Sequence, residues 1–322
     1  MSGRLVLVDA ASAYFRAFHG IPATVTSPDG RPVNAVRGLL DVLAHIVATR
    51  RPDELVCCWD VDWRPAWRVA LIPSYKAHRL AVDDGGPDGP GTEQVPAALI
   101  GQVGLIRDVL AAAGIAVVGA EGYEADDVMA TLAADGVRRG LEVDLVSGDR
   151  DLFQLADSGG GQQPPVRVVY TGRGNARVLI LDDAAIASRY GIPAGTYADF
   201  ATLRGDPSDG LPGVPGVGDR TAAQLLTRFG TLDDVVGAAE AGDPGLTASV
   251  RTKILSAADQ LPAMKRVVRV VADIPIDVPP DGWPVPVVPA DAGWWSRLVS
   301  EHGLRGSADR LAAALSWPTP GQ

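Results

Sequence analysis

Short apolar runs and longer amphipathic segments alternate along the first half of the chain. Four apolar runs, rich in valine and bounded by polar or glycine residues, predict buried strands at 4–8, 55–59, 115–118 and 143–146. Segments with helical spacing of apolar residues lie between them at 36–48, 99–113 and 128–137. Alternating strands and helices predict an α/β fold, with a mostly parallel central sheet flanked by helices. Continuous apolar strands agree with this, because parallel strands are covered on both faces.

The pattern changes after about residue 182. Helical spacing replaces the strands, and a glycine-dense turn at 213–218 separates two helical segments. We therefore expect an α/β domain over 1–181, a helical subdomain over 182–277 and a C-terminal extension over 278–322. The proline-rich stretch 275–289 is typical of a linker or wrapping segment. Glycine, proline and acidic residues at 83–93 predict a mobile surface loop, and 157–165 predicts a second break.

The composition is that of a soluble globular protein. The chain has 322 residues, of which 47% are apolar and 21% charged, enough for about two structural units. No stretch of about 18 apolar residues lacks a charge, so a membrane span is excluded, and the N-terminus is unlike a secretory signal. Cys57 and Cys58 are neighbours in an apolar run, which favours a reducing compartment. We expect a cytoplasmic protein, without a membrane partner.

Net charge and its distribution point in different directions. The chain carries 29 Lys and Arg against 39 Asp and Glu, a formal net charge of −10, whereas duplex-binding proteins usually leave a basic footprint. Carboxylates gathered around metal ions could make the total negative while other surfaces stay basic. Both kinds of cluster therefore have to be sought.

Basic residues gather in two places. The segment 63–79, WRPAWRVALIPSYKAHR, holds four Lys or Arg, three large aromatic residues and no acid, a combination suited to single-stranded nucleic acid. Alternatively, Trp67 and Leu71 are core residues at helical spacing and the charges form a solvated face; we favour this for Trp67 but not for Lys76 and Arg79. The second region predicts contact with a duplex backbone and contains Arg251, Lys253, Lys265, Arg266 and Arg269.

Acidic residues follow each of the four predicted strands. They are Asp9, Asp60, Glu124, and the pair Asp149 and Asp151. Because the carboxyl ends of parallel strands lie along one edge of a sheet, we expect these side chains to converge there. Converging carboxylates raise one another's pKa, whereas hard divalent cations neutralise them, so the pattern predicts a site for Mg²⁺ or Mn²⁺. Each acid alone could be a turn former or a helix N-cap, and only their joint occurrence favours a metal site.

Two further acidic groups accompany this set. Asp126 and Asp127 stand beside Glu124 in GYEADDV, where each alone could be a first-turn acid favoured by the helix dipole. On a helix, positions 124 and 127 share a face and 126 points elsewhere, so one capping role does not explain all three. Asp206 and Asp209 directly precede GVPGVG, whose glycines let a backbone approach a phosphate closely. The alternative for this turn is a tight connection between two helices.

Five ordered motifs resemble the 5′-nuclease or flap-endonuclease family, particularly the 5′-nuclease domain attached to bacterial DNA polymerase I. The motifs are LVDAASAYFRAFHG, WDVDWRPAWRVALIPSYKAHR, GYEADDV, VSGDRDLFQL and RGDPSDGLPGVPGVGDRTA, and the likeness runs from about residue 4 to residue 277. No polymerase part follows, so the chain is similar to the freestanding bacterial 5′-3′ exonuclease. It differs from many relatives in having Phe15, Trp59, Arg150 and Gly210 in place of Tyr, Phe, Lys and Asn, and His78 inside the gateway motif.

The resemblance implies a PIN-like 5′-nuclease fold, an arch or gateway around 63–96, and a helix-hairpin-helix element that holds duplex DNA and a K⁺ ion. It implies two or more divalent ions, one held by Asp9, Asp60, Glu124 and Asp126. A further site would use Asp127, Asp149, Asp151, Asp206 and Asp209. Catalytic roles fall to Lys76 and Arg79 of the gateway. The DNA-binding residues would be Phe15, Arg16, Gly213, Gly216, Gly218 and Arg220.

The activity implied is metal-dependent hydrolysis of phosphodiesters near DNA 5′ ends or 5′ flaps, RNA-primed ones included, in primer removal and repair. One ion would activate a water and a second, about 4 Å away, would stabilise the leaving oxygen. Lys76 and Arg79 would offset charge on the phosphate, and terminal nucleotides would unpair to reach the metals. We expect a monomer associated with the nucleoid. Two alternatives stay open: a DNA-junction-binding protein with a silent nuclease centre, and a structure-specific ribonuclease.

Overall fold

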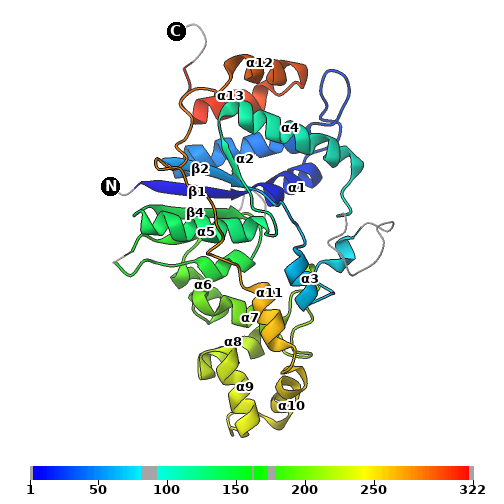
Figure 1. Ribbon diagram of the computed structural model, residues 1–322, viewed down its shortest axis with the longest axis vertical. Helices are drawn as coiled ribbons and strands as arrows, with labels where there is room; N and C mark the ends of the chain where they lie inside the picture. The colour runs from blue at the N-terminus through cyan, green and yellow to red at the C-terminus, as the bar shows by residue number, and fades with distance from the viewer. Residues whose placement is uncertain (1–2, 81–92, 162, 173–177, 319–322) are drawn as a thin grey trace.

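A computed structural model describes residues 3–80, 93–161, 163–172 and 178–318 (Figure 1). At its centre these residues form a six-stranded sheet in the order β3-β2-β1-β4-β5-β6. All neighbouring strands pair in parallel except β6, which is antiparallel to β5. The strands are β1 (Arg4–Asp9), β2 (Glu54–Cys58), β3 (Ala116–Val118), β4 (Glu142–Ser147), β5 (Val166–Tyr170) and β6 (Leu179–Leu181). The predicted mostly parallel sheet is confirmed, and β5 and β6 extend it beyond the four predicted strands.

Helices cover both faces of the sheet. Side chains alternate along β1, so Leu5 and Leu7 join the core that contains α5, whereas Val6 and Val8 join the core beneath α2 and α4. Figure 1 shows α1, α2 and α4 above the sheet and α5 below it. The bounds of these helices are α1 (Ala10–Gly20), α2 (Asn34–Arg50), α4 (Ala97–Ala113) and α5 (Ala125–Arg138). This is the three-layer arrangement that buries parallel strands on both sides.

The strand order reverses between β1 and β4. The chain adds β2 and β3 on one side of β1 and then crosses to place β4 and β5 on the other. In open parallel sheets, ligands bind outside the carboxyl ends of the strands at such a reversal. Asp9 ends β1 and Ser147 ends β4, and the Ser147 hydroxyl donates a hydrogen bond of 2.7 Å to the Asp9 carboxylate. The fold thus fixes the first predicted acid at the expected ligand-binding edge.

Beyond the sheet the chain is helical, and this part extends downward in Figure 1. It contains α6 (Asp183–Tyr190), α7 (Tyr197–Arg204), α8 (Asp219–Phe229), α9 (Leu232–Ala241), α10 (Ala248–Ala257) and α11 (Leu261–Val268). The glycine-rich turn connects α7 to α8, as the sequence predicted. The short α3 (Ala66–Leu71) and a 3₁₀ turn, η1 (Ala77–Arg79), come from the gateway segment and lie beside this part. The domain limits at 181 and 277 stay predictions.

The proline-rich segment after α11 returns along the sheet domain. The Leu55 amide donates to the Trp283 carbonyl at 3.0 Å and the Val285 amide to the Asp53 carbonyl at 3.0 Å, beside the amino end of β2. Two further helices, α12 (Ala292–Glu301) and α13 (Arg305–Ala314), then pack on α4 and α2. The segment therefore wraps the domain, as its proline content predicted.

Part of the predicted gateway lies outside the described residues. Residues 81–92 belong to this part, so the structure does not address the predicted mobile loop at 83–93 or the outer portion of the arch. Within the ranges that the structure describes, no helix is long and apolar enough to cross a membrane.

Candidate nuclease site

A cavity of about 1170 Å³ opens at the carboxyl edge of the sheet. Its lining includes two gateway cations, Lys76 and Arg79, and an aromatic wall to which Phe15 and Trp59 contribute. Acids from four separate segments also line it: Asp9, Asp60, Glu124, Asp126 and Asp149. The structure thus brings together residues that are up to 140 positions apart, because parallel strands end at one edge.

The acids of this cavity perturb one another electrostatically. Burial, followed by the charge of Asp60, raises the pKa of Asp9 to about 7. Burial and then the charges of Asp149 and Asp9 raise the pKa of Asp126 well above its usual range, and burial with Asp209 raises that of Asp149. Like charges held together out of water favour the neutral form of each acid. A bound cation would reverse that preference.

A second acidic group adjoins the first without lining the cavity. Asp151 is buried, and burial followed by the charges of Asp149, Asp209 and Asp206 raises its pKa well above the usual range. One of its oxygens, Oδ1, has no hydrogen-bond partner. Asp206 accepts from the Ser208 amide at 2.9 Å, and Asp209 accepts from the Arg79 guanidinium at 3.0 Å. These acids continue the negative region toward the helical part.

The chemistry of this donor set fits hard divalent cations, which prefer oxygen ligands. Among the described residues, however, no group of three or more Asp, Glu, His or Cys side chains is already placed to hold a metal ion. Asp9 accepts from the Ser12 amide at 2.9 Å, and Asp60 accepts from the Ala125 amide at 2.7 Å, so each keeps further acceptor capacity.

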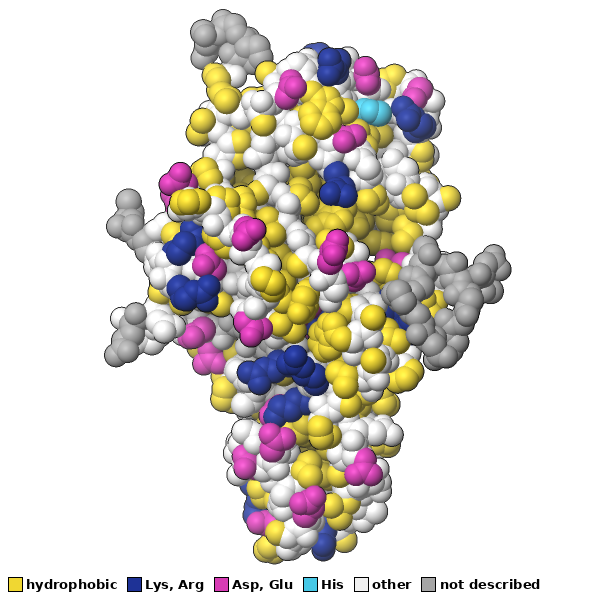
Figure 2. Space-filling model, viewed as in Figure 1, with side chains coloured by type: hydrophobic (Ala, Val, Ile, Leu, Met, Phe, Trp, Pro, Cys, Tyr) yellow, Lys and Arg dark blue, Asp and Glu magenta, His cyan; other side chains and the backbone are white. Residues whose placement is uncertain are grey.

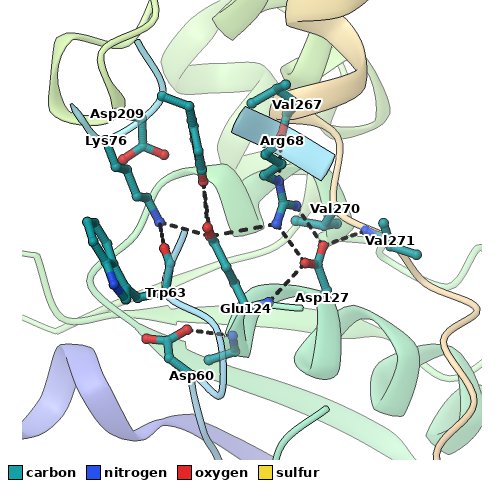
Figure 3. A network of polar contacts seen from close by, with 12 residues as sticks. Asp60, Trp63, Arg68, Lys76, Glu124, Asp127, Asp209, Val267, Val270 and Val271 are labelled. Carbon is teal, nitrogen blue, oxygen red and sulfur yellow. Dashed lines mark hydrogen bonds and ion pairs between the residues drawn. The ribbon is translucent and has the colours of Figure 1, made fainter. Parts of the chain in front are cut away.

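Glu124 has the densest set of partners in the cavity (Figure 3). Its carboxylate accepts from the Tyr75 hydroxyl at 2.9 Å and 3.0 Å and from the Lys76 ammonium at 2.8 Å. Burial raises the pKa of Glu124 to about 7, although Lys76 and Arg68 oppose that shift. Burial alone would lower the pKa of Lys76, but Glu124 holds it well above its usual range. The ammonium therefore stays charged at the cavity wall.

Asp127, which is also in the predicted ligand set, does not line this cavity. Its side chain is fully buried and receives two hydrogen bonds from Arg68, at 2.7 Å and 2.8 Å. The amides of Val271 and Glu124 donate to the same carboxylate at 2.8 Å and 3.2 Å. The predicted shared helix face does not apply, because Glu124 precedes α5 as its extended N-cap and forms a capping box with Asp127. Both oxygens of Asp127 are occupied by protein donors.

The glycine-rich turn has the close backbone contacts expected of it. Gly213 has φ +62°, and a Cβ there would lie 2.2 Å from the Gly205 amide nitrogen, so only glycine fits. Gly216 also has positive φ, +75°, whereas Gly218 has φ −100° and precedes α8 as its N-cap. The Lys253 ammonium donates to the Gly216 carbonyl at 3.0 Å. The predicted K⁺ ion at this turn stays a prediction.

Only glycine fits at position 210, beside the second acidic group. Its φ is +71°, and a Cβ would lie 2.4 Å from the Ser74 carbonyl oxygen. This close approach lets the Lys76 amide donate to the Asp209 carbonyl at 2.9 Å. The residue that differs from many relatives therefore joins the gateway segment directly to the acidic loop.

Comparisons with known proteins agree with this arrangement. The family model described as "5'-3' exonuclease, N-terminal resolvase-like domain" matches residues 4–191, and that described as "5'-3' exonuclease, C-terminal SAM fold" matches residues 192–289. The chain belongs to the 5′-3′ exonuclease family. It is 49% identical over 311 residues to a 5′-3′ exonuclease of Streptomyces coelicolor, covering 97% of this chain and 100% of that one. A 5′-3′ exonuclease of Mycobacterium tuberculosis is 48% identical and covers 98% of each chain.

The chain is also similar to a part of DNA polymerase I and to two solved structures of lower sequence identity. DNA polymerase I of Mycobacterium bovis is 32% identical over 313 residues, which is 97% of this chain but 32% of the polymerase. The T5 5′-exonuclease with bound zinc has a TM-score of 0.61 at 15% identity and covers 97% of this chain and 98% of its own. The catalytic core of Rad2 in complex with DNA substrate has a TM-score of 0.63 at 16% identity, covering 97% and 93%. These two structures show that the fold is shared.

In this family member the cationic segment 63–79 divides into two parts. Arg64 and Arg68 are buried, at 1% and 2% exposure, so they do not belong to a surface stripe, although Arg64 also borders the cavity; Lys76 and Arg79 are half-buried in the cavity lining. Trp67 is half-buried, with the Arg68 guanidinium 4.5 Å from its ring centre. Leu71 is 40% exposed and is not a core residue. The single-strand-binding interpretation therefore applies only to the second half of the segment.

The second basic region also contains side chains with protein partners and side chains that are exposed. Arg251 donates to the Ala239 carbonyl at 2.8 Å, and Lys265 pairs with Asp199 and Asp233 at 3.3 Å and 3.1 Å. Arg266 and Arg269 on and beside α11 are exposed. Figure 2 shows Lys and Arg side chains gathered at this level of the molecule.

The remaining predicted DNA-binding residues lie around the site. Arg16 is exposed and donates to the Gly148 carbonyl at 3.4 Å, next to Asp149. Arg220 lines a second cavity of about 920 Å³ between α6 and α8, together with Arg150, Arg189 and Arg228. This cavity supplies a cationic surface on the helical part.

Sequence reasoning missed three functional positions. Tyr75 and Ser147 hold Glu124 and Asp9 through their hydroxyls, and Arg68 holds Asp127. Tyr75 and Arg68 stand inside the WRPAWRVALIPSYKAHR motif and were assigned only to a stacking or cationic surface. Ser147 directly precedes GDRD at the end of a predicted strand, which is the signal that could have identified it.

Proposed function

We propose that this chain is a structure-specific 5′ nuclease that uses divalent metal ions to hydrolyse phosphodiesters near 5′ ends and 5′ flaps of DNA. The observation that supports this best is the convergence of five of the predicted ligand acids with Lys76 and Arg79 in one cavity at the strand-order reversal. Membership of the 5′-3′ exonuclease family gives the reaction class.

Metal dependence is proposed from the donor chemistry. Divalent ions, when bound, supply Lewis-acid activation of water and of the leaving oxygen. The residues that would hold them are Asp9, Asp60, Glu124, Asp126 and Asp149, with Asp151, Asp206 and Asp209 alongside. Burial and neighbouring acids raise the pKa of Asp9, Asp126 and Asp151, and Asp151 carries a buried oxygen without a protein donor. Mg²⁺ and Mn²⁺ share this preference for oxygen.

Lys76 and Arg79 orient and neutralise the scissile phosphate in this proposal. Both now pair with acids, Lys76 with Glu124 and Arg79 with Asp209. When cations neutralise those acids, the ammonium and guanidinium become available to phosphate oxygens. Electrostatic groups of this kind usually contribute about 10²–10³-fold to the rate.

Recognition of DNA structure rather than sequence follows from the shape of the site. The acids lie within a cavity, so a phosphate inside a stacked duplex does not reach them, and unpairing of terminal nucleotides costs about a few kcal/mol. Phe15 and Trp59 present aromatic surface to an unpaired base. The glycine-rich turn and Arg220 face a duplex backbone through amides and charge.

The Rad2 neighbour was solved with DNA substrate, which supports DNA as the partner. RNA-primed flaps fit the same phosphate chemistry, and we propose that the chain acts as a monomer. Sedimentation velocity with and without flap DNA tests the oligomeric state.

A labelled-flap assay tests the proposal. Purified protein receives a 5′-labelled flap duplex with Mg²⁺, with Mn²⁺ or with EDTA, and Asp149→Asn serves as the variant. We expect cleavage that needs the cation, leaves 5′-phosphate and 3′-hydroxyl ends, and is lost in the variant. Parallel RNA and RNA-primed flaps define the sugar preference.

Three results would contradict the proposal. Equal cleavage by the wild type and Asp149→Asn would remove the metal-site assignment. Binding of flap DNA without cleavage under either cation would indicate a silent centre. Cleavage of RNA alone would indicate a ribonuclease.

A further inference from the structure

We infer that Arg68 and Asp127 form a buried positioning pair for the nuclease centre, which sets Lys76 against Glu124, and that Asp127 is not a metal ligand. This inference rests on the proposed function and assigns roles within it. It concerns residues that touch neither the cavity nor a substrate, so neither is a catalytic residue.

The pair joins four segments of the chain at one point. Arg68 on α3 forms a two-point contact with Asp127 on α5, at 2.7 Å and 2.8 Å, and its Nε donates to the Val267 carbonyl of α11 at 3.2 Å. Asp127 accepts from the amide of Val271 in the wrapping segment at 2.8 Å. Figure 3 shows these contacts beside Glu124. The root of the gateway is thereby fixed to α5, which has Glu124 as its N-cap and carries Asp126 in its first turn.

The same pair is connected to the Lys76 ammonium through a short series of contacts. Arg68 Nη1 lies 3.8 Å from the Glu124 carboxylate, and Asp127 accepts from the Glu124 amide at 3.2 Å. Glu124 in turn receives the Lys76 ammonium at 2.8 Å. Lys76 follows α3 by five residues, so a shift of α3 against α5 moves Lys76 relative to Glu124 directly.

This geometry disfavours coordination of a metal ion by Asp127. Its side chain has no exposed surface, and its two oxygens together accept four hydrogen bonds from protein donors. Coordination would require breaking the Arg68 contact and leaving that guanidinium buried without its counter-ion, which is strongly unfavourable. Asp126, one residue earlier, lines the cavity and has no such partner among the described residues.

A matched control exists at the opposite edge of the sheet. Arg50 forms a similar two-point contact with the fully buried Asp144, at 2.8 Å and 3.0 Å; neither residue lines the cavity, and Arg4 lies 3.5 Å from the same carboxylate, as Glu124 lies near Arg68. The same substitution at both arginines separates loss of a buried ion pair from loss of positioning.

The first experiment measures kcat and KM for flap cleavage at saturating Mg²⁺. We expect Arg68→Met to lower kcat about 10²-fold with little change in KM, because a displacement of about 1 Å at a reacting group has that effect. Arg50→Met lowers the unfolding midpoint and leaves kcat per folded molecule unchanged. Arg68→Met combined with Asp127→Leu recovers the midpoint through apolar packing, whereas kcat stays low.

A double-mutant cycle with Lys76→Ala tests the route of the effect. If Arg68 acts through Lys76, adding Arg68→Met to Lys76→Ala costs much less than it costs the wild type. Equal fold-losses in both backgrounds would overturn the positioning role, as would recovery of kcat together with the midpoint in the apolar double variant.

Mn²⁺ binding followed by electron paramagnetic resonance, without DNA, tests the ligand assignment independently of activity. Asp127→Asn should bind Mn²⁺ with wild-type number and affinity, and Asp126→Asn should bind it more weakly. Equal weakening in the two variants would restore Asp127 as a ligand and overturn the inference. A wild type that cleaves nothing would overturn the proposed function and the positioning role with it, while the Mn²⁺ comparison would still decide the status of Asp127.

Discussion

The two edges of the central sheet differ in whether all of their buried acidic residues have a basic partner. At the amino edge each buried or half-buried acid has an arginine: Glu54 pairs with Arg139 at 2.6 Å, and Asp144 with Arg50 at 2.8 Å. Glu142 pairs with two arginines, Arg4 and Arg167. At the carboxyl edge, by contrast, Asp9, Asp126 and Asp149 form no ion pair with any residue that the structure describes.

The difference separates stability from function. Paired acids at the amino edge keep their charge at little cost, because the partner compensates for lost hydration. Unpaired acids at the carboxyl edge raise one another's pKa and make the cation-free fold less stable than it could be. That strain is the property that selects a divalent cation, and proteins commonly retain such strain at functional sites.

The largest expected effect comes from removing one unpaired acid. We expect Asp126→Asn to lower flap cleavage by about 10³-fold, since it removes a proposed cation ligand. In EDTA the variant should unfold at a higher temperature than the wild type, because one repelled charge is gone. Activity and calorimetric measurements on the same preparation check both parts; a drop in stability would mean that the edge is not strained.

The corresponding substitution at the amino edge should lower stability and leave cleavage unchanged. Asp144→Asn leaves Arg50 without its buried counter-ion, and we expect a loss of about 3 kcal/mol in the free energy of unfolding. Cleavage per folded molecule should stay at the wild-type level. Urea unfolding gives the first quantity and active-site titration the second, and an equal loss of turnover would show that the two edges are not independent.

Divalent cations should stabilise only through the carboxyl edge. At Mg²⁺ concentrations about 100 times the dissociation constant, we expect a gain of about 2.7 kcal/mol over EDTA. Asp126→Asn should reduce this gain and Asp144→Asn should not. Thermal unfolding across a Mg²⁺ series measures it, and a similar gain in all three proteins would point to non-specific binding.

The smallest effect is a pH dependence at the amino edge. Hydrogen bonds from Arg167 and then Arg4 lower the pKa of Glu142 from its usual 4.5. A lowered folded-state pKa gives stability that is present above pH 4.5 and is lost as the pH falls through the folded value. Because the group is partly exposed, we expect less than about 1 kcal/mol. Unfolding midpoints of the wild type and Glu142→Gln should converge as the pH falls below 4.5, and parallel curves would contradict this.

Four of the six strands, and the edge at which the acids meet, could be predicted from the sequence alone. Asp9, Asp60 and Asp149 each follow an apolar run, and parallel strands bring their carboxyl ends together whatever packs around them. The glycines at 213 and 216 could be recognised for a similar reason, since a turn with positive φ has few alternatives. These are local rules of the backbone.

Which charged side chains line the cavity and which are buried in ion pairs depends on tertiary packing and could not be predicted from the sequence. Asp126 and Asp127 are neighbours of identical chemistry, yet one lines the cavity and the other meets Arg68, because successive helix positions point about 100° apart. Arg68 and Lys76 likewise belong to one basic segment, but α11 and α5 enclose the first and leave the second at the cavity. Composition and spacing give the number and direction of side chains, whereas their partners come from segments distant along the chain, and those partners determine each charge's role.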